Sequence, residues 1–258
     1  MKARAPGLRR HPVRRWLRSL ALMLLWELRS LRLVLPLAMV VQVFVGAGMA
    51  IGVGFFVDEM PRLHAQYLTT GVAVITLITL GLVLAPQLIA QQKAAGIQDY
   101  LFSLPVPRTA AVAAGLLVHS AIAVPGALLA LAVGARRYDL AFEPGLLVLP
   151  ACALTLITAA SIGFAMAYAI RNPMVTGMLT QVLVFVILLF SPIQYPAERL
   201  PAWLATVHRF LPFAHAANVV RAGLVPELAS EVAFSFGVLA AWAAGSWAVM
   251  AWVVGRRG

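Results

Sequence analysis

The stretch LTTGVAVITLITLGLVLAPQLI, residues 68–89, contains no charged side chain. A helix needs about 20 apolar residues to cross the hydrocarbon core of a bilayer, so this stretch is long enough to span a membrane. Other apolar stretches of similar length lie on both sides of it, at residues 33–56, 109–134, 146–170, 174–190 and 232–254. The sequence therefore predicts an all-α integral membrane protein with six transmembrane helices.

The composition leaves little room for anything else. Hydrophobic residues make up 62% of the 258 residues and charged residues only 11%, whereas a soluble domain carries about a quarter charged residues. We expect a basic tail over residues 1–32 and a single six-span transmembrane domain over residues 33–258, with no soluble enzyme domain. The single cysteine, Cys152, excludes an intrachain disulfide and a metal or redox site built on several cysteines.

The positive charge is concentrated on one side of the predicted membrane domain. If the N-terminus is cytoplasmic, the inner segments hold fourteen of the 20 Lys and Arg residues. Cytoplasmic loops of membrane proteins carry an excess of Lys and Arg. This asymmetry predicts that both termini are cytoplasmic. The net charge of +11, much of it in the tail, predicts that the tail contacts anionic lipid. It does not indicate a nucleic-acid partner.

The tail contains a candidate amphipathic helix. An apolar face with tryptophan, flanked by arginine, is typical of a helix that lies in the headgroup region. The alternative is a long cytoplasmic start to the first span. The apolar stripe consists of Val13, Trp16, Leu17, Leu20, Leu24, Leu28 and Leu31, and the flanking arginines are Arg14, Arg15, Arg18 and Arg29.

Two connections between spans differ from simple turns. The inner one, residues 91–108, predicts a short helix from Gln92 to Leu104 that ends before Pro105. Ile97, Leu101 and Leu104 share one face of it, so it could dock into a partner's groove or lie as a loop against lipid headgroups.

The outer connection, from Phe190 to Arg221, is too apolar for a solvated loop and too rich in proline for a span. Such segments enter the membrane and return where protein surrounds them. The alternative is an amphipathic loop on the outer leaflet.

These two connections resemble those of the permease subunits of type-2 ABC exporters, six-span proteins that include drug, antibiotic and polysaccharide exporters. The inner segment KAAGIQDYLFSLPV, residues 93–106, resembles the family's cytoplasmic segment between spans two and three. The outer matches are SPI at 191–193, YP at 195–196, LPAWL at 200–204 and LP at 211–212. Gln91 and Gln92 stand where the family often has an acidic residue.

The resemblance implies a coupling helix that docks a separate cytoplasmic ATPase, and an outer re-entrant gate. The chain would bind no cofactor itself, because ATP and magnesium would sit on a dimer of that ATPase, and no phosphate-binding loop GxxxxGK[ST] occurs in this sequence. A second permease subunit, identical or a sibling, would complete the path in a bacterial inner membrane. The implied coupling residues are Lys93, Gly96, Ile97, Gln98, Asp99, Tyr100, Leu101 and Leu104; the implied gate residues are Ser191, Pro192, Tyr195, Pro196, Leu200, Pro201, Trp203 and Pro212.

Three polar side chains lie within the predicted spans. Gln42, His119 and Gln181 could line the path or could form hydrogen bonds between helices. The alternative function is a gradient-driven secondary transporter or a channel. An intramembrane enzyme is disfavoured, because the spans contain no pair of catalytic groups. The sequence does not identify the cargo. An apolar path suits an amphipathic, drug-like or lipid-like substrate.

Overall fold

The computed structural model describes residues 12–55 and 61–256. Within that part of the chain, six helical segments are long and apolar enough to cross a membrane, which confirms the six predicted spans. They are α2 (Val34–Gly54), the continuous segment of α3 (Arg62–Thr79), η1 (Leu80–Leu84) and α4 (Ala85–Ala94), then α6 (Arg108–Arg137), α7 (Val148–Ala169), α8 (Pro173–Phe190) and α11 (Val232–Gly255). The first eleven residues of the basic tail and Phe56 of the first predicted span lie outside the described residues.

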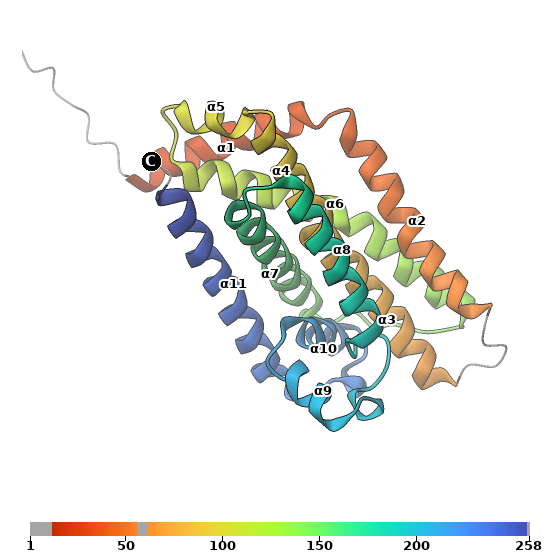
Figure 1. Ribbon diagram of the computed structural model, residues 1–258. Helices are drawn as coiled ribbons and strands as arrows, with labels where there is room; N and C mark the ends of the chain where they lie inside the picture. Colours follow the sequence, from red (N-terminus) through yellow and green to blue (C-terminus); the bar gives the residue numbers. More distant parts are fainter. Residues whose placement is uncertain (1–11, 56–60, 257–258) are drawn as a thin grey trace, which may run out of the picture.

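The shorter helices gather at the two ends of the bundle (Figure 1). At one end lie α1 (Pro12–Ser30), α5 (Ile97–Ser103) and the end of α11. At the opposite end lie η2 (Ala197–Arg199), α9 (Ala202–His208), α10 (Pro212–Leu224) and η3 (Pro226–Leu228). The two unusual connections of the sequence therefore occupy opposite ends of the molecule.

The second span is longer than its apolar core. Hydropathy predicts residues 68–89, but the helix runs from Arg62 to Ala94, because its polar first turns and its last turn continue the backbone hydrogen bonds beyond the apolar stretch. Its middle is a π-helical turn, η1, which ends two residues before Pro86. Proline lacks a backbone N–H, and a widened turn is one way for a helix to accommodate this loss.

Glycine allows two pairs of spans to approach closely. A Cβ at Gly81 would lie 2.7 Å from the backbone nitrogen of Ala160, so the second span presses directly on α7. A Cβ at Gly126 would lie 2.6 Å from the carbonyl oxygen of Gln42, so α6 presses on α2 in the same way. Small residues allow such contacts where lipid offers no hydrophobic force between helices.

The helix α10 is part of the core although it is not one of the spans. It packs against α3, α7 and α11, and Phe213, Ala217, Val219 and Val220 are buried among their side chains. The connection between α8 and α11 therefore packs within the bundle.

Candidate functional site

The connection between the second and third spans forms a sharp elbow between α4 and α5. The helix predicted across Gln92–Leu104 is divided, because α4 ends at Ala94 and α5 begins at Ile97. Between them Gly96 has φ 73°, in the left-handed region that favours glycine. Lys93 therefore belongs to α4, and Leu104 is the extended residue that ends α5 before Pro105.

The buried side chain of Gln98 holds α5 against the bundle through two hydrogen bonds. The Tyr168 hydroxyl in α7 donates a hydrogen bond to Gln98 Oε1 at 3.0 Å. Gln98 Nε2 in turn donates to Gln92 Oε1 in α4 at 3.2 Å. Leu101 is buried beside Gln98, so these two residues form the bundle-facing side of α5.

The opposite side of α5 is exposed and partly apolar. Tyr100 is 62% exposed and Ile97 39% exposed, although both are large hydrophobic side chains. Asp99 is exposed on the same short helix. Of the predicted apolar stripe, Leu101 therefore faces the bundle and Ile97 faces away from it.

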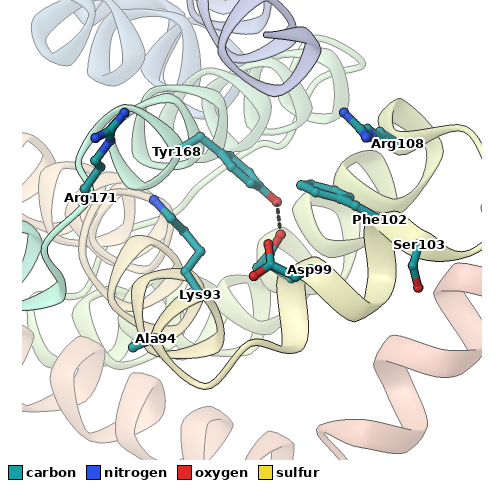
Figure 2. A pocket seen from close by; sticks show the side chains of 9 residues that line it. Lys93, Ala94, Asp99, Phe102, Ser103, Arg108, Tyr168 and Arg171 are labelled. Carbon is teal, nitrogen blue, oxygen red and sulfur yellow. Dashed lines mark hydrogen bonds between the residues drawn. The ribbon is translucent and has the colours of Figure 1, made fainter. Parts of the chain in front are cut away.

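A cavity of about 470 Å³ lies between α5 and the ends of α4 and α7. Lys93 Nζ donates to the carbonyl oxygens of Ala167 and Ile170, both at 2.7 Å, and so caps the end of α7. Figure 2 shows Lys93, Tyr168 and Phe102 around the cavity, with Arg108 and Arg171 at its sides. We call this cavity the basic cup; its lining residues are Lys93, Ala94, Gln98, Asp99, Phe102, Ser103, Arg108, Tyr168 and Arg171.

The helix α1 lies against α6. Trp16 Nε1 donates to Thr109 Oγ1 at 3.1 Å. The buried face of α1 is offset from the predicted stripe: Ser19, Met23 and Glu27 are buried, whereas Val13, Leu17 and Leu28 are exposed. The flanking arginines Arg14, Arg15, Arg18 and Arg29 are all exposed.

Glu27 and His119 form a buried pair that sequence reasoning missed. Glu27 Oε1 lies 4.0 Å from His119 Nδ1, and Nδ1 donates to the Gly115 carbonyl oxygen at 2.7 Å. No partner is found for His119 Nε2 within the described residues. Burial raises the pKa of Glu27 to about 7. The only signal in the sequence was a lone carboxylate within a strongly basic helix.

The three predicted path residues lie in different surroundings. Gln42 is buried, and its Nε2 donates to the Thr76 carbonyl oxygen of α3 at 3.0 Å. His119 faces α1, as described above. Gln181 is exposed on α8 among apolar side chains. The structure does not bring these three together in one protomer.

At the other end of the bundle, the predicted gate residues differ in how far they are buried. Ser191, Pro192 and Pro212 are buried, Tyr195, Pro196 and Leu200 are half-buried, and Pro201 and Trp203 are exposed. The Tyr195 hydroxyl donates to the Leu189 carbonyl oxygen at 3.1 Å, which ties the loop back to α8.

Arg221 is the residue that joins this segment to the bundle, and sequence reasoning missed it. It is only 4% exposed. Its Nε donates to Thr70 Oγ1 at 3.1 Å, and its Nη2 donates to the carbonyl oxygens of Ile193 and Tyr67. Its guanidinium lies 4.3 Å from the centroid of the Tyr67 ring. A buried cation is thus satisfied by carbonyl, hydroxyl and aromatic groups from α3 and from the loop that follows α8.

The part of the chain described here contains no group of three or more His, Cys, Asp or Glu side chains that could hold a metal ion. Residues 18–225, from α1 to the end of α10, match the family model described as ABC-2 type transporter. The chain belongs to this family. A comparison with curated proteins finds no matching relative. The family match confirms the resemblance seen in the sequence and makes the chain the permease component of an ABC transporter.

Proposed function

We propose that this permease is one half of an ATP-driven exporter and that it docks a cytoplasmic ABC ATPase dimer through α5, with α1 beside it. The ATPase would bind ATP and magnesium, and the permease would bind no cofactor. Both termini would be cytoplasmic, in a bacterial inner membrane. The observation that carries the proposal is the two-sided construction of α5.

The two sides of α5 suit a helix that transmits force. Its inner side is held by Gln98 and Leu101, so a push on α5 moves α4 and α7 rather than α5 alone. Its outer side exposes Ile97 and Tyr100, which offer apolar area to the groove of a partner. A surface loop that only rested on headgroups would need no buried hydrogen bonds of this kind.

The test replaces the exposed side and leaves the buried side intact. Ile97→Asp combined with Tyr100→Asp is expected to abolish co-purification of the ATPase from native membranes in mild detergent. Leu146→Asp is the control, because Leu146 is an apolar side chain that is 92% exposed and follows Gly145, whose amide donates to the Gly223 carbonyl oxygen of α10 at the opposite end of the bundle. If the double variant retains the ATPase as well as the control does, α5 is not the docking helix.

A second permease subunit would complete the path. The helices α2 and α8 each present a long exposed apolar face, with Phe44 73% and Phe185 56% exposed. Gln181 is exposed on α8, where a partner subunit or an aqueous path could satisfy its amide. We propose that α2 of one copy packs against α8 of the other.

Cysteine cross-linking tests this arrangement. In a Cys152→Ala background, Phe44→Cys and Met178→Cys are expected to cross-link between two copies. Phe44→Cys with Trp252→Cys on α11 is the control and is expected to remain monomeric. Cross-links in the control pair alone would place the interface elsewhere.

The segment from Ser191 to Leu224 would close the outer exit, and the cargo would be an amphipathic, drug-like or lipid-like molecule that reaches the path from the inner leaflet. Candidate cargoes that stimulate ATP hydrolysis by the reconstituted complex would identify it. A bundle that carries no ATPase from native membranes would instead favour the alternative, a gradient-driven transporter or channel.

A further inference from the structure

The basic cup lies at the level where several spans end. Lys93 and Ala94 are the last residues of the second span, Arg108 is the first residue of the third, and Arg171 follows the end of the fourth. All these ends lie at the α5 end of the bundle (Figure 1). Span ends mark the membrane–water boundary, which is the level of the lipid phosphates. Phe102 and Tyr168 line the cup at the same level, and tyrosine is one of the residues enriched there.

The lining of the cup is positive. Lys93, Arg108 and Arg171 bring three cations, and Asp99 brings one carboxylate. The other acid of this end within the described residues, Glu27, belongs to α1 and faces His119. The cup therefore carries an excess of positive charge and favours an anion.

Contacts within the protein hold two of the cations, Lys93 and Arg108, in place. Lys93 is held by the carbonyl oxygens at the end of α7. Arg108 Nη1 donates to the Val254 carbonyl oxygen at 3.1 Å, and its guanidinium lies 5.3 Å from the centroid of the Phe102 ring. The carbonyl group and the aromatic ring that contact Arg108 hold it in place without cancelling its formal charge. A site of this kind loses little side-chain entropy on binding.

We propose that the basic cup binds the phosphate of an anionic glycerophospholipid from the leaflet on the α5 side. A volume of about 470 Å³ is sufficient for a phosphodiester and its glycerol. Basic pockets between transmembrane helices at this depth bind such headgroups. Because the walls belong to α4, α5, α6 and α7, the bound headgroup would tie the elbow at Gly96 to the end of α7. The site requires only the permease in a membrane and does not depend on the ATPase.

The test counts lipids on the full permease. Native mass spectrometry of the protein from nanodiscs of mixed phosphatidylglycerol and phosphatidylcholine is expected to show phosphatidylglycerol retained in preference. Arg171→Gln is the first variant, because Arg171 is exposed and its loss should not disturb folding. Loss of one cation near the headgroups is expected to weaken retention about fivefold. Arg108→Gln is expected to weaken it at least as much.

Arg15→Gln on α1 is the matched control, since it removes one exposed charge from the same end outside the cup. Equal losses in Arg15→Gln and Arg171→Gln would mean a diffuse surface field and would overturn the proposal. Inorganic phosphate that stabilises the lipid-free protein as well as phosphatidylglycerol does would overturn it in favour of a free anion. Unchanged lipid retention in Arg171→Gln, with loss of the ATPase, would assign the cup to an acidic side chain of that partner instead.

Discussion

At one end of the permease a short helix, α5, lies on the surface and is fastened by side chains, whereas at the other end α10 lies inside the bundle. The fastening of α5 rests on neutral groups, with Gln98 between Tyr168 and Gln92. The fastening of α10 rests on a buried cation, Arg221. Hydrogen bonds between neutral groups contribute modestly to stability, and bonds from a charged group contribute more. We therefore expect displacement of α5 from the bundle to cost less free energy than displacement of α10.

Removal of the buried cation should have the largest effect. Arg221→Met leaves Thr70, Tyr67 and Ile193 without their shared donor, and we expect it to lower the free energy of unfolding by roughly 3 kcal/mol. Thermal unfolding in detergent measures this. Arg209→Met is the control, because Arg209 is exposed at the same end. Equal melting temperatures for the two variants would show that Arg221 does not hold α10.

The span that connects the two ends should be next in sensitivity. Gly81→Ala places a Cβ against the backbone of Ala160, which cannot turn aside, and we expect a loss of about 2 kcal/mol in the free energy of unfolding. Gly245→Ala on α11 meets nothing within 4 Å and should be neutral or slightly stabilising. The same thermal measurement decides, and an unaffected Gly81→Ala variant would contradict the close approach of the second span and α7.

A smaller and local effect is expected at α5. Gln98→Leu removes two hydrogen bonds and leaves the Tyr168 hydroxyl without its acceptor. We expect amide hydrogen exchange in Ile97–Ser103 to accelerate about tenfold, while global melting changes little. Tyr100→Phe removes an exposed hydroxyl from the same helix and should leave exchange unchanged. Exchange that remains slow in Gln98→Leu would mean that Leu101 alone fastens α5.

The smallest effect on global stability is expected at α1, which packs on α6 and is not one of the six spans. Burial raises the pKa of Glu27 from 4.5 to about 7, so the folded state retains a proton that the detached carboxyl would lose. The contact of α1 with α6 is therefore strongest below about pH 4.5 and weakens as pH rises to about 7. His119 faces the same carboxyl from α6, and the measured midpoint belongs to the pair.

Hydrogen exchange of α1 amides between pH 4.5 and 8, corrected for the intrinsic rate, follows this contact. Glu27→Gln keeps the shape of the side chain and is expected to remove the pH dependence. A persistent pH dependence in that variant would assign it to another group, with His119 as the next residue to replace.

The spans were predictable because each is encoded within one continuous stretch, such as residues 68–89. The break at Gly96 was not read from the sequence, because glycine is tolerated in a helix and only the path of the chain requires its positive φ. Arg221 counted as one of the arginines of the outer loops. Its burial depends on carbonyl and hydroxyl groups from Tyr67, Thr70 and Ile193, which are distant in sequence. The pairing of Glu27 with His119 was hidden for the same reason.

The π-helical turn at Leu80–Leu84 has a consequence for how the two ends communicate. A π turn accommodates one extra residue, which rotates the following helix face by about 100° relative to an uninterrupted α-helix. On one side of this phase shift α3 packs on α2, α6, α7 and α10; on the other side α4 packs on α7, α8 and α5. The two halves of the second span therefore present differently oriented faces to their neighbours, and α7 contacts both halves. Deletion of one residue between Leu80 and Leu84 is expected to restore a continuous α-helix and to rotate one half of the span away from the helices that it contacts.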